Sequence, residues 1–268
     1  MSDPALQRQR MVIGQIHARG VRDARVLAAM GKVRREAFVP EQMRDLAYAD
    51  TPLPIAAEQT ISQPYIVAYM IEALALEGGE KVLEIGSGSG YAAAVLAEIA
   101  DEVYTIERIG VLAEEAAAHL AEEGYDNVHV LHADGTKGWG EVAPFDAILV
   151  SAGAPDVPEA LKSQLAIGGR MVLPVGRDPR AQELIRITRR EEQEFDREDL
   201  ADVRFVPLIG EEGWEAEKPA AETTRPRLIQ SRPRMSVTLP SLISRHGEGF
   251  ENLETADLDP LLERINDA

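Results

Sequence analysis

The sequence predicts an α/β protein built on a doubly wound, mostly parallel sheet. Between residues 81 and 176, short apolar runs alternate with helical runs, which is typical of a parallel sheet that carries helices on both faces. A glycine-rich loop follows the first apolar run and opens a helix. Two further strand-like runs flank a charged turn within residues 183–210, so we expect a sheet of about seven strands with an antiparallel C-terminal edge.

Helical segments precede this sheet. Gly20 separates two amphipathic runs, and Pro40 ends the helical lead-in. Pro64 is expected to open the next helix, because proline is well tolerated at the first helical position. The predicted helices cover residues 3–18, 23–33, 64–76, 91–100 and 110–124, and a last one lies within 157–169, before a turn. The predicted strands of the parallel part cover residues 81–86, 102–107, 127–134, 145–153 and 170–176.

Length and composition place the chain among globular proteins. Its 268 residues can form one large domain, or a domain of about 200 residues with an appendage. Cysteine is absent, which excludes disulfides, thiolate metal sites and cysteine nucleophiles. No apolar run is long enough to span a membrane, and the N-terminus lacks the apolar core of a signal peptide. We therefore expect a cytoplasmic protein.

The chain is strongly acidic, with a net charge of -18 from 46 acidic and 28 basic residues. Because binding to nucleic acid or to anionic membranes needs basic surface, neither is expected as a partner. The acidic excess fits two interpretations. It keeps a protein soluble, and it suits a salt-rich cytoplasm in which ions screen like-charge repulsion.

A change in composition after Trp214 marks a domain boundary. Residues 215–234 combine prolines and charges without a hydrophobic period, as linkers do. We therefore divide the chain into a folded domain at 1–212, a linker at 213–238 and a C-terminal extension at 239–268. The extension regains apolar residues but is too short to fold alone.

The glycine-rich loop lies within "VLEIGSGSGY", residues 82–91. Its glycines allow a ligand to approach the backbone, and the helix start that follows suits an anion, although such a loop is also found as a simple tight turn. A dinucleotide loop of the form Gly-x-Gly-x-x-Gly would put Tyr91 at its third glycine, where a bulky ring spoils close packing. The run instead resembles the first motif of S-adenosylmethionine-dependent methyltransferases, read here as Glu84-x-Gly86-x-Gly88-x-Gly90.

Two acidic residues end the next two predicted strands. Glu107 follows Gly86 by about 20 residues, where a carboxylate can accept both ribose hydroxyls; the alternative is an exposed acid in an acidic chain. Asp134 could accept a hydrogen bond from an adenine amino group, or it could cap a turn. Asp146 begins a strand and is interpreted as structural.

Thr60 and Ser62 lie upstream of the sheet, in "QTISQPYIVAYM" at residues 59–70. The first interpretation is a helix cap, with the Ser62 hydroxyl satisfying a free N–H of the helix at Pro64. The second is a substrate site. This stretch, the glycine loop, "FDAILVSAGAPDVPEALKSQLAIGGRMVLPVG" at 145–176 and "VRFVPL" at 203–208 together resemble the protein L-isoaspartyl O-methyltransferase family, over about residues 5–212.

The resemblance implies a Rossmann-like methyltransferase fold and an activity. Members of the family methylate the free carboxylate of L-isoaspartyl residues in damaged proteins and peptides, and the ester then collapses to a succinimide, which begins repair. It implies that Ser62 is the catalytic residue, donating a hydrogen bond to that carboxylate, and that backbone groups of Val206 and Leu208 bind the substrate. It implies that S-adenosylmethionine, which leaves as S-adenosylhomocysteine, is bound by Thr60, Ser62, Glu84, Gly86, Ser87, Gly88, Gly90, Glu107, Arg108, Asp134 and Gly135.

Some features depart from this pattern or leave alternatives open. Members often have Gly-Asp-Gly where this chain has Ala133-Asp134-Gly135. The five histidines are scattered and are not expected to bind a metal. Residues 242–268 weakly resemble the start of an erythromycin-esterase-like domain, and the alternative is an extension that wraps the domain or mediates dimerisation. The acceptor could also be another carboxylate or a small molecule, or the domain could be a cofactor-binding module for a fused partner. The oligomeric state is not predicted.

Overall fold

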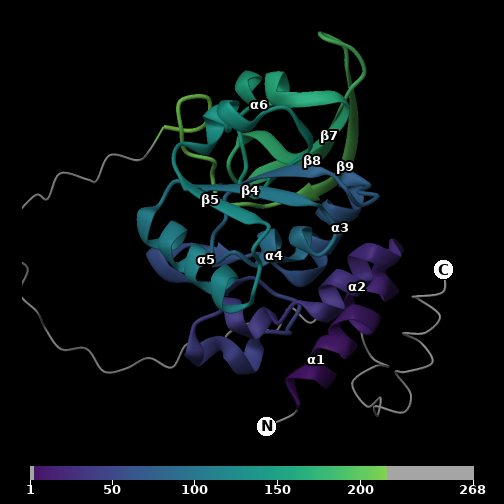
Figure 1. Cartoon of the computed structure of the whole chain (residues 1–268), viewed down its shortest axis with the longest axis vertical. Coiled ribbons are helices and arrows are strands. Elements are labelled where there is room, and N and C mark those ends of the chain that lie inside the picture. The colour runs from purple at the N-terminus through teal and green to yellow at the C-terminus, as the bar shows by residue number, and fades with distance from the viewer. Residues whose placement is uncertain (1–2, 216–268) are drawn as a thin grey trace, which may run out of the picture.

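A seven-stranded sheet runs through the middle of the protein, with strand order β5-β4-β3-β6-β7-β8-β9 (Figure 1). This computed structural model describes residues 3–215. The strands of the sheet are β3 (Lys81–Ile85), β4 (Glu102–Glu107), β5 (Val128–His132), β6 (Phe145–Val150), β7 (Leu165–Asp178), β8 (Ala181–Arg189) and β9 (Phe195–Val203). The α-helices are α1 (Pro4–Arg10), α2 (Ala24–Lys32), α3 (Pro64–Leu74), α4 (Tyr91–Ala97), α5 (Gly110–Glu122) and α6 (Glu159–Gln164).

The strand pairing confirms the predicted fold class. β3 pairs in parallel with β4 and with β6, and the pairs β4–β5 and β6–β7 are also parallel. β8 and β9 add the predicted antiparallel edge. From β3 the chain builds outward to β4 and β5, then returns to place β6 on the other side of β3. Such a reversal opens a crevice at the carboxyl ends of the strands, where ligands of doubly wound folds bind.

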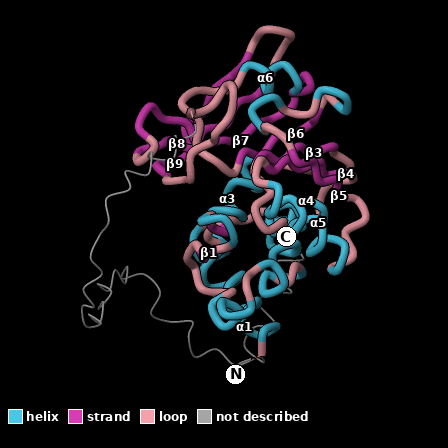
Figure 2. The backbone as a smooth tube through the Cα atoms, turned by 90° about the vertical axis from the view of Figure 1, so that its left-hand side faces the viewer, coloured by secondary structure: helices cyan, strands magenta, loops and turns pink. Residues whose placement is uncertain are grey.

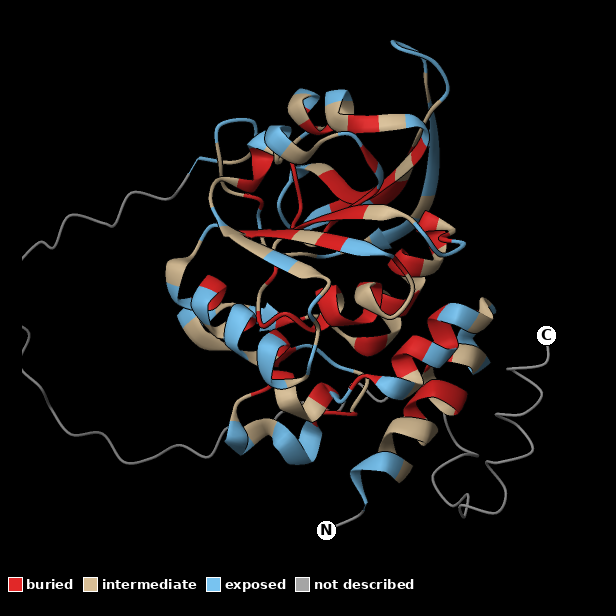
Figure 3. Cartoon of the chain, viewed as in Figure 1, coloured by how far each residue is buried: buried red, intermediate tan, exposed pale blue. Residues whose placement is uncertain are grey.

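Helices cover both faces of the sheet. Figure 1 and Figure 2 place α3, α4 and α5 on one side and α6 on the other, and both views put α1 on the α3–α5 side. Successive strand residues point to opposite faces, so Leu149 belongs to the core under α3–α5 while Ile148 and Val150 belong to the core under α6. Figure 3 shows the buried residues gathered along the sheet and on the helix sides that face it.

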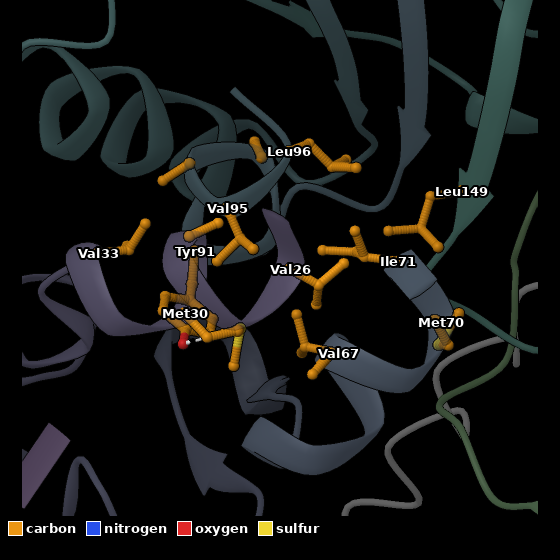
Figure 4. Close-up of a cluster of buried hydrophobic side chains, with 14 of the residues drawn as sticks. Val26, Met30, Val33, Val67, Met70, Ile71, Tyr91, Val95, Leu96 and Leu149 are labelled. Atoms are coloured by element: carbon orange, nitrogen blue, oxygen red, sulfur yellow. Dashed lines mark hydrogen bonds between the residues drawn. The ribbon is translucent and has the colours of Figure 1, made fainter. Parts of the chain in front are cut away.

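The N-terminal helices extend the core on the α3–α5 side. Met30 and Val26 of α2 pack against Val67 and Ile71 of α3 and against Tyr91 of α4 (Figure 4). The amphipathic helix α2 therefore buries its apolar face against α3 and α4 and does not form a separate unit. This packing fixes α3, and with it the stretch that carries Ser62.

Three local features differ from the predicted elements. The end of the segment 157–169, predicted as a helix followed by a turn, forms the start of β7, because Leu165 pairs with Phe145 before a register shift. The first helix passes into a π-helical turn at Met11–Ile16 before it ends near Gly20. The proline-rich stretch before α3 contains a small antiparallel pair, β1 (Leu53–Pro54) with β2 (Thr60–Ile61).

The predicted linker at 213–238 and extension at 239–268 lie outside the described residues, except for 213–215. The resemblance of residues 242–268 to another domain also falls there, so the division of the chain beyond residue 215 stays a prediction. Among residues 3–215, no helix is long and apolar enough to cross a membrane.

The central strand should dominate the stability of the domain. Leu83 of β3 is fully buried, and truncating such a side chain costs about 2–5 kcal/mol through lost burial and the cavity left behind. We expect Leu83→Ala to lower the free energy of unfolding by this amount in urea titrations. Leu46→Ala is the matched control, because Leu46 is 51% exposed and its loss should cost no more than about 0.5 kcal/mol. Equal losses in the two variants would contradict this description of the core.

Candidate active site

A cavity opens at the carboxyl ends of β3, β4 and β6, at the reversal of strand order. The loop after β3 lines it, together with β2, Ser62 and the segment that follows β9. Most residues predicted to bind cofactor or substrate line this cavity: Thr60, Ser62, Glu84, Gly86, Ser87, Gly88, Glu107, Arg108, Gly135, Val206 and Leu208. Gly90 and Asp134 do not lie on its wall.

The glycine loop is shaped by positive backbone angles. Gly86, Gly88 and Gly90 have φ values of 92°, 54° and 94°, a region that side chains disfavour. The N–H of Gly86 donates to Ile106 O at 2.8 Å, which ties the loop to the end of β4. A Cβ on Gly90 would lie 3.3 Å from Leu120, so this glycine serves the close packing of α4 on α5 rather than the cavity wall.

Tyr91 follows the loop and begins α4. Its ring is buried against Phe38, with centroids 5.9 Å apart, and the guanidinium of Arg35 lies over it at 4.8 Å. The large side chain thus points into the N-terminal helical layer. This placement agrees with the exclusion of the dinucleotide register, in which a third glycine would allow the helix to pack closely on the strand.

A buried hydrogen-bond chain joins Glu84 to the loop. The hydroxyl of Thr105 donates to Glu84 Oε2 at 2.6 Å, and the Ser87 hydroxyl lies 2.6 Å from Thr105 Oγ1. Since the Thr105 proton goes to Glu84, Ser87 is the donor in the second bond. Glu84 Oε1 is buried and has no partner within residues 3–215. Burial raises the pKa of Glu84 to about 8; the bond from Thr105 acts against this rise, and the nearby Glu107 adds to it.

Glu107 fixes the loop from the end of β4. Its Oε2 accepts from Gly88 N at 3.0 Å, and its Oε1 accepts from Ile109 N at 2.9 Å. A carboxylate oxygen has two lone pairs, so these bonds leave each oxygen able to accept once more from a ligand in the cavity. Glu107 is therefore buried and structurally engaged, which rules out the alternative of an exposed acid.

Asp134 behaves as a turn residue in this structure. Its Oδ1 accepts from the N–H and the hydroxyl of Thr136, at 2.9 and 2.7 Å, and its Oδ2 accepts from Glu211 N at 2.9 Å. Partial burial acts to raise the pKa of Asp134, but these hydrogen bonds outweigh it and hold the pKa below its usual range. The adjacent Gly135 lines the cavity instead. Asp146 accepts from Lys81 N at 2.9 Å, a structural role as predicted.

Ser62 does not cap α3. The N-cap residue is Gln63, with no capping bond from its own side chain, and Asp50 Oδ1 accepts from Tyr65 N at 3.3 Å. Asp50 also accepts from the amide of Gln63 at 2.8 Å and pairs with Arg19. The cap interpretation of Ser62 is therefore wrong, and within residues 3–215 its hydroxyl makes no hydrogen bond.

A second, open cleft adjoins the cavity. It lies between the start of α3, with Tyr65 and Tyr69, and the segment after β9, with Arg204. The rings of the two tyrosines stack with centroids 5.9 Å apart. The residues shared by cleft and cavity are Thr60, Ser62, Ser151, Phe205, Val206 and Pro207. Ser62 thus lies where the cavity and the adjoining cleft meet.

The backbone of the segment after β9 is largely engaged. Val206 O accepts from Gly153 N at 2.8 Å, while Leu208 N donates to Gly153 O at 2.8 Å and Leu208 O accepts from Trp214 N at 2.7 Å. The N–H of Leu208 is therefore already used within the protein, and its carbonyl oxygen has one acceptor position left for the predicted substrate. Within residues 3–215 the N–H of Val206 stays free, so it is the group of this pair that can donate to a substrate.

Gln182 of β8 anchors the same wall. Its side chain is buried, accepts from Phe205 N at 2.7 Å and donates to Phe205 O at 3.4 Å. A Cβ on Gly153 would come within 2.1 Å of this amide, so Gly153 is required for the close approach. The cleft wall is thereby attached to the antiparallel edge of the sheet.

Two residues of the site were missed in the sequence. Ser151 directly follows β6 and borders both the cavity and the cleft; the signal was a polar residue at the end of a buried strand, the same signal that singled out Glu107. Asp50 had no such signal, because it lies far from α3 in a segment without a regular pattern.

Among the described histidines, His129 pairs with a single acidic residue, Glu102, with Nε2 3.0 Å from Oε2. Within residues 3–215 no group of three or more histidine, aspartate or glutamate side chains is placed to hold a metal ion. His119 Nδ1 lies 3.0 Å from Ser89 O and His132 Nε2 lies 3.1 Å from Arg108 O. His246 is outside the described residues.

Comparison with known proteins relates this site to a family. The sequence model described as "Protein-L-isoaspartate(D-aspartate) O-methyltransferase (PCMT)" matches residues 7–213. The chain belongs to this family. A protein-L-isoaspartate O-methyltransferase of Rhodopseudomonas palustris is 66% identical over 215 residues, covering 80% of this chain and 99% of the relative. One of Marinobacter nauticus is 59% identical over 207 residues, covering 77% of this chain and 94% of the relative.

Solved structures of the family share the fold. A protein-L-isoaspartate O-methyltransferase structure has a TM-score of 0.70 at 28% identity, covering 77% of this chain and 67% of that one. A Plasmodium falciparum structure described under the same activity has a TM-score of 0.67 at 27% identity, covering 75% of this chain and 98% of that one. That structure is a complex with S-adenosyl-L-homocysteine.

Glu84 should make stability depend on pH. Its pKa is about 8 in the folded protein against an ordinary 4.5, so the folded state binds more protons between these values and stability falls as pH rises through this window. We expect Glu84→Gln to remove this dependence, which is worth up to about 1.4 kcal/mol per pH unit. Urea unfolding between pH 5 and pH 8 measures it.

Glu114→Gln is the control for this prediction, because Glu114 is an exposed residue of α5. Its variant should keep the pH slope of the unaltered protein. A Glu84→Gln variant whose stability declines with pH as steeply as the unaltered protein would show that Glu84 is already ionised in the fold.

Proposed function

We propose that this protein transfers a methyl group from S-adenosylmethionine to the free carboxylate of L-isoaspartyl residues in damaged proteins and peptides. The observation that carries the proposal is the position of Ser62, at the junction of the cavity and the open cleft. A methyl donor in the cavity and a protein segment in the cleft would meet there. Family membership supports both the enzyme class and the acceptor.

The cavity residues fit S-adenosylmethionine. Glu84 presents a buried carboxyl oxygen without a partner among the described residues, and Glu107 offers lone pairs at the end of β4. These carboxyl oxygens can accept hydrogen bonds from the amino and hydroxyl groups of such a ligand. Gly86 and Gly88 leave the loop backbone open to close approach. When bound, the cofactor supplies a methyl group on a positively charged sulfur that leaves readily.

The acceptor needs little chemical help from the protein. A carboxylate is ionised near neutral pH and is already a nucleophile, so no general base is required. The task of the site is to bring a carboxylate oxygen to the methyl donor in line. Positioning of this kind supplies about 7–11 kcal/mol in favourable cases.

Ser62 performs part of this positioning. It lies in the short segment between β2 and α3, and Asp50 rather than Ser62 satisfies the helix start. The hydroxyl is therefore available to donate a hydrogen bond to the acceptor carboxylate. A neutral donor holds the carboxylate without the strong charge stabilisation that an arginine would give, so the oxygen remains reactive.

The methyl ester needs no further catalysis by this site. It collapses to a succinimide, which hydrolyses in part to ordinary aspartate, so the methylation begins repair. The partner is accordingly a protein or peptide. The strong negative charge of the chain supports the absence of nucleic acid as a partner, and a cytoplasmic location remains part of the proposal.

The deciding experiment offers matched isoaspartyl and aspartyl peptides with methyl-labelled S-adenosylmethionine. We expect base-labile label on the isoaspartyl peptide alone, because a methyl ester is cleaved by base. Label on another carboxylate or on a small molecule would show that the acceptor is not the isoaspartyl residue. Cofactor binding without transfer to any acceptor would indicate a binding module.

Replacing Ser62 by alanine should lower turnover. The variant loses one hydrogen bond to a charged group, worth about 1.5–3 kcal/mol, which corresponds to a turnover roughly 10- to 100-fold lower. The affinity for S-adenosylhomocysteine should change less, and calorimetry measures it separately. Turnover equal to that of the unaltered protein would remove Ser62 from the mechanism.

A further inference from the structure

Ser151 lines the same junction of cavity and cleft as Ser62, but it comes from a different element of the fold. It follows β6, while Ser62 precedes α3, and both residues line the cavity and the cleft. Only three side chains among the shared residues carry a hydrogen-bond donor, namely those of Thr60, Ser62 and Ser151. Of the three, Ser151 is the residue that the sequence did not single out.

The backbone holds Ser151 firmly beside the glycine loop. Its N–H donates to Ile85 O at 2.8 Å, which continues the pairing of β6 with β3 by one residue. A Cβ built on Gly86 would lie 3.6 Å from the Ser151 Cβ, so the two residues are neighbours at the strand ends. A residue fixed on a strand end holds its side chain more accurately than one on a loose loop.

The hydroxyl of Ser151 is available. Ser151 is partly buried, and within the described chain its hydroxyl has no hydrogen-bond partner, whereas the Ser87 hydroxyl in the same cavity is taken by Thr105. A half-buried hydroxyl that gains a partner only when a ligand binds is suited to ligand recognition, since its bond adds to affinity without breaking one in the protein.

Few other donors remain at the junction. Phe205 N donates to Gln182, Pro207 has no N–H, and Leu208 N donates to Gly153. The Val206 N–H is free among the described residues. A carboxylate has about four acceptor positions, and the Ser62 hydroxyl supplies only one bond to it.

We propose that Ser151 is a second substrate-binding residue, whose hydroxyl donates a hydrogen bond to the acceptor carboxylate together with Ser62. The inference rests on the proposed function, and it assigns to the end of β6 a part in orienting the acceptor. Ser151 keeps its proton throughout, because it neither attacks nor acts as a base. Two neutral hydroxyls from two separate elements fix the direction of the carboxylate, which one hydroxyl leaves free to rotate.

The test measures binding apart from turnover. Ser151→Ala is titrated with an isoaspartyl peptide in the presence of saturating S-adenosylhomocysteine, and separately with S-adenosylhomocysteine alone. We expect peptide binding to weaken about tenfold or more, the loss of one hydrogen bond to a charged group, with S-adenosylhomocysteine binding changed less than twofold. Ser163→Ala is the matched control, because the Ser163 hydroxyl bonds to Ala160 O on the exposed face of α6; both affinities should stay the same.

A double-mutant cycle with Ser62→Ala completes the test. If both hydroxyls hold one carboxylate, the two variants are coupled, so the fold-loss of peptide affinity in the double variant differs from the product of the two single fold-losses. The loss is smaller than the product if removing either hydroxyl already frees the carboxylate. It is larger if either hydroxyl alone still keeps the carboxylate in its orientation. Unchanged peptide binding by Ser151→Ala, independent effects of the two variants, or an equal loss of S-adenosylhomocysteine affinity would overturn the proposal. An unaltered protein that binds no isoaspartyl peptide would instead overturn the proposed function, and this inference with it.

Discussion

The placement of β3 between β4 and β6 is the constraint on which the whole site depends. In this register Ile85 lies level with Ile106 on one side and with Val150 on the other. The residues that follow these three positions are Gly86, Glu107 and Ser151, so the loop, the acid and the hydroxyl meet at one edge because the strands are parallel and in register. A shift of β3 by one residue would turn its side chains to the opposite face of the sheet and move Gly86 out of line with Glu107 and Ser151.

Much of the fold could be predicted because local signals and tertiary packing agree. The glycines and the alternation of apolar runs marked β3, α4 and β4 with small errors at their ends. The start of β7 was hidden, because Ile167 is 68% exposed and Gly168 has a positive φ, so this part of the strand lacks a buried alternation and contains two consecutive glycines, which are typical of a turn. Its pairing with β6 is a long-range effect that no local pattern records.

The site divides in the same way. Residues on the loop and at strand ends were identified from their sequence position, and the structure brings most of them to one cavity, although their roles toward ligands remain predictions. The cap of α3 was assigned to the wrong residue, since Asp50 is distant in sequence from Tyr65. For Asp134, the sequence left a turn and a ligand contact open; two bonds from Thr136 show that it caps a turn, while the ligand contact stays a prediction. Such choices depend on which groups meet in space.

The cleft has walls from distant parts of the chain. One wall comes from the segment around Ser62 and α3, and the other from residues after β9 that Gln182 fastens to the sheet edge. During synthesis, the elements of the glycine loop and β3–β6 leave the ribosome before β8 and β9 exist, but a domain generally folds as a unit. Because residues after β9 line both the cavity and the cleft, neither is complete until this last segment has been made. Recognition of damaged proteins thus begins only when the entire domain has been made.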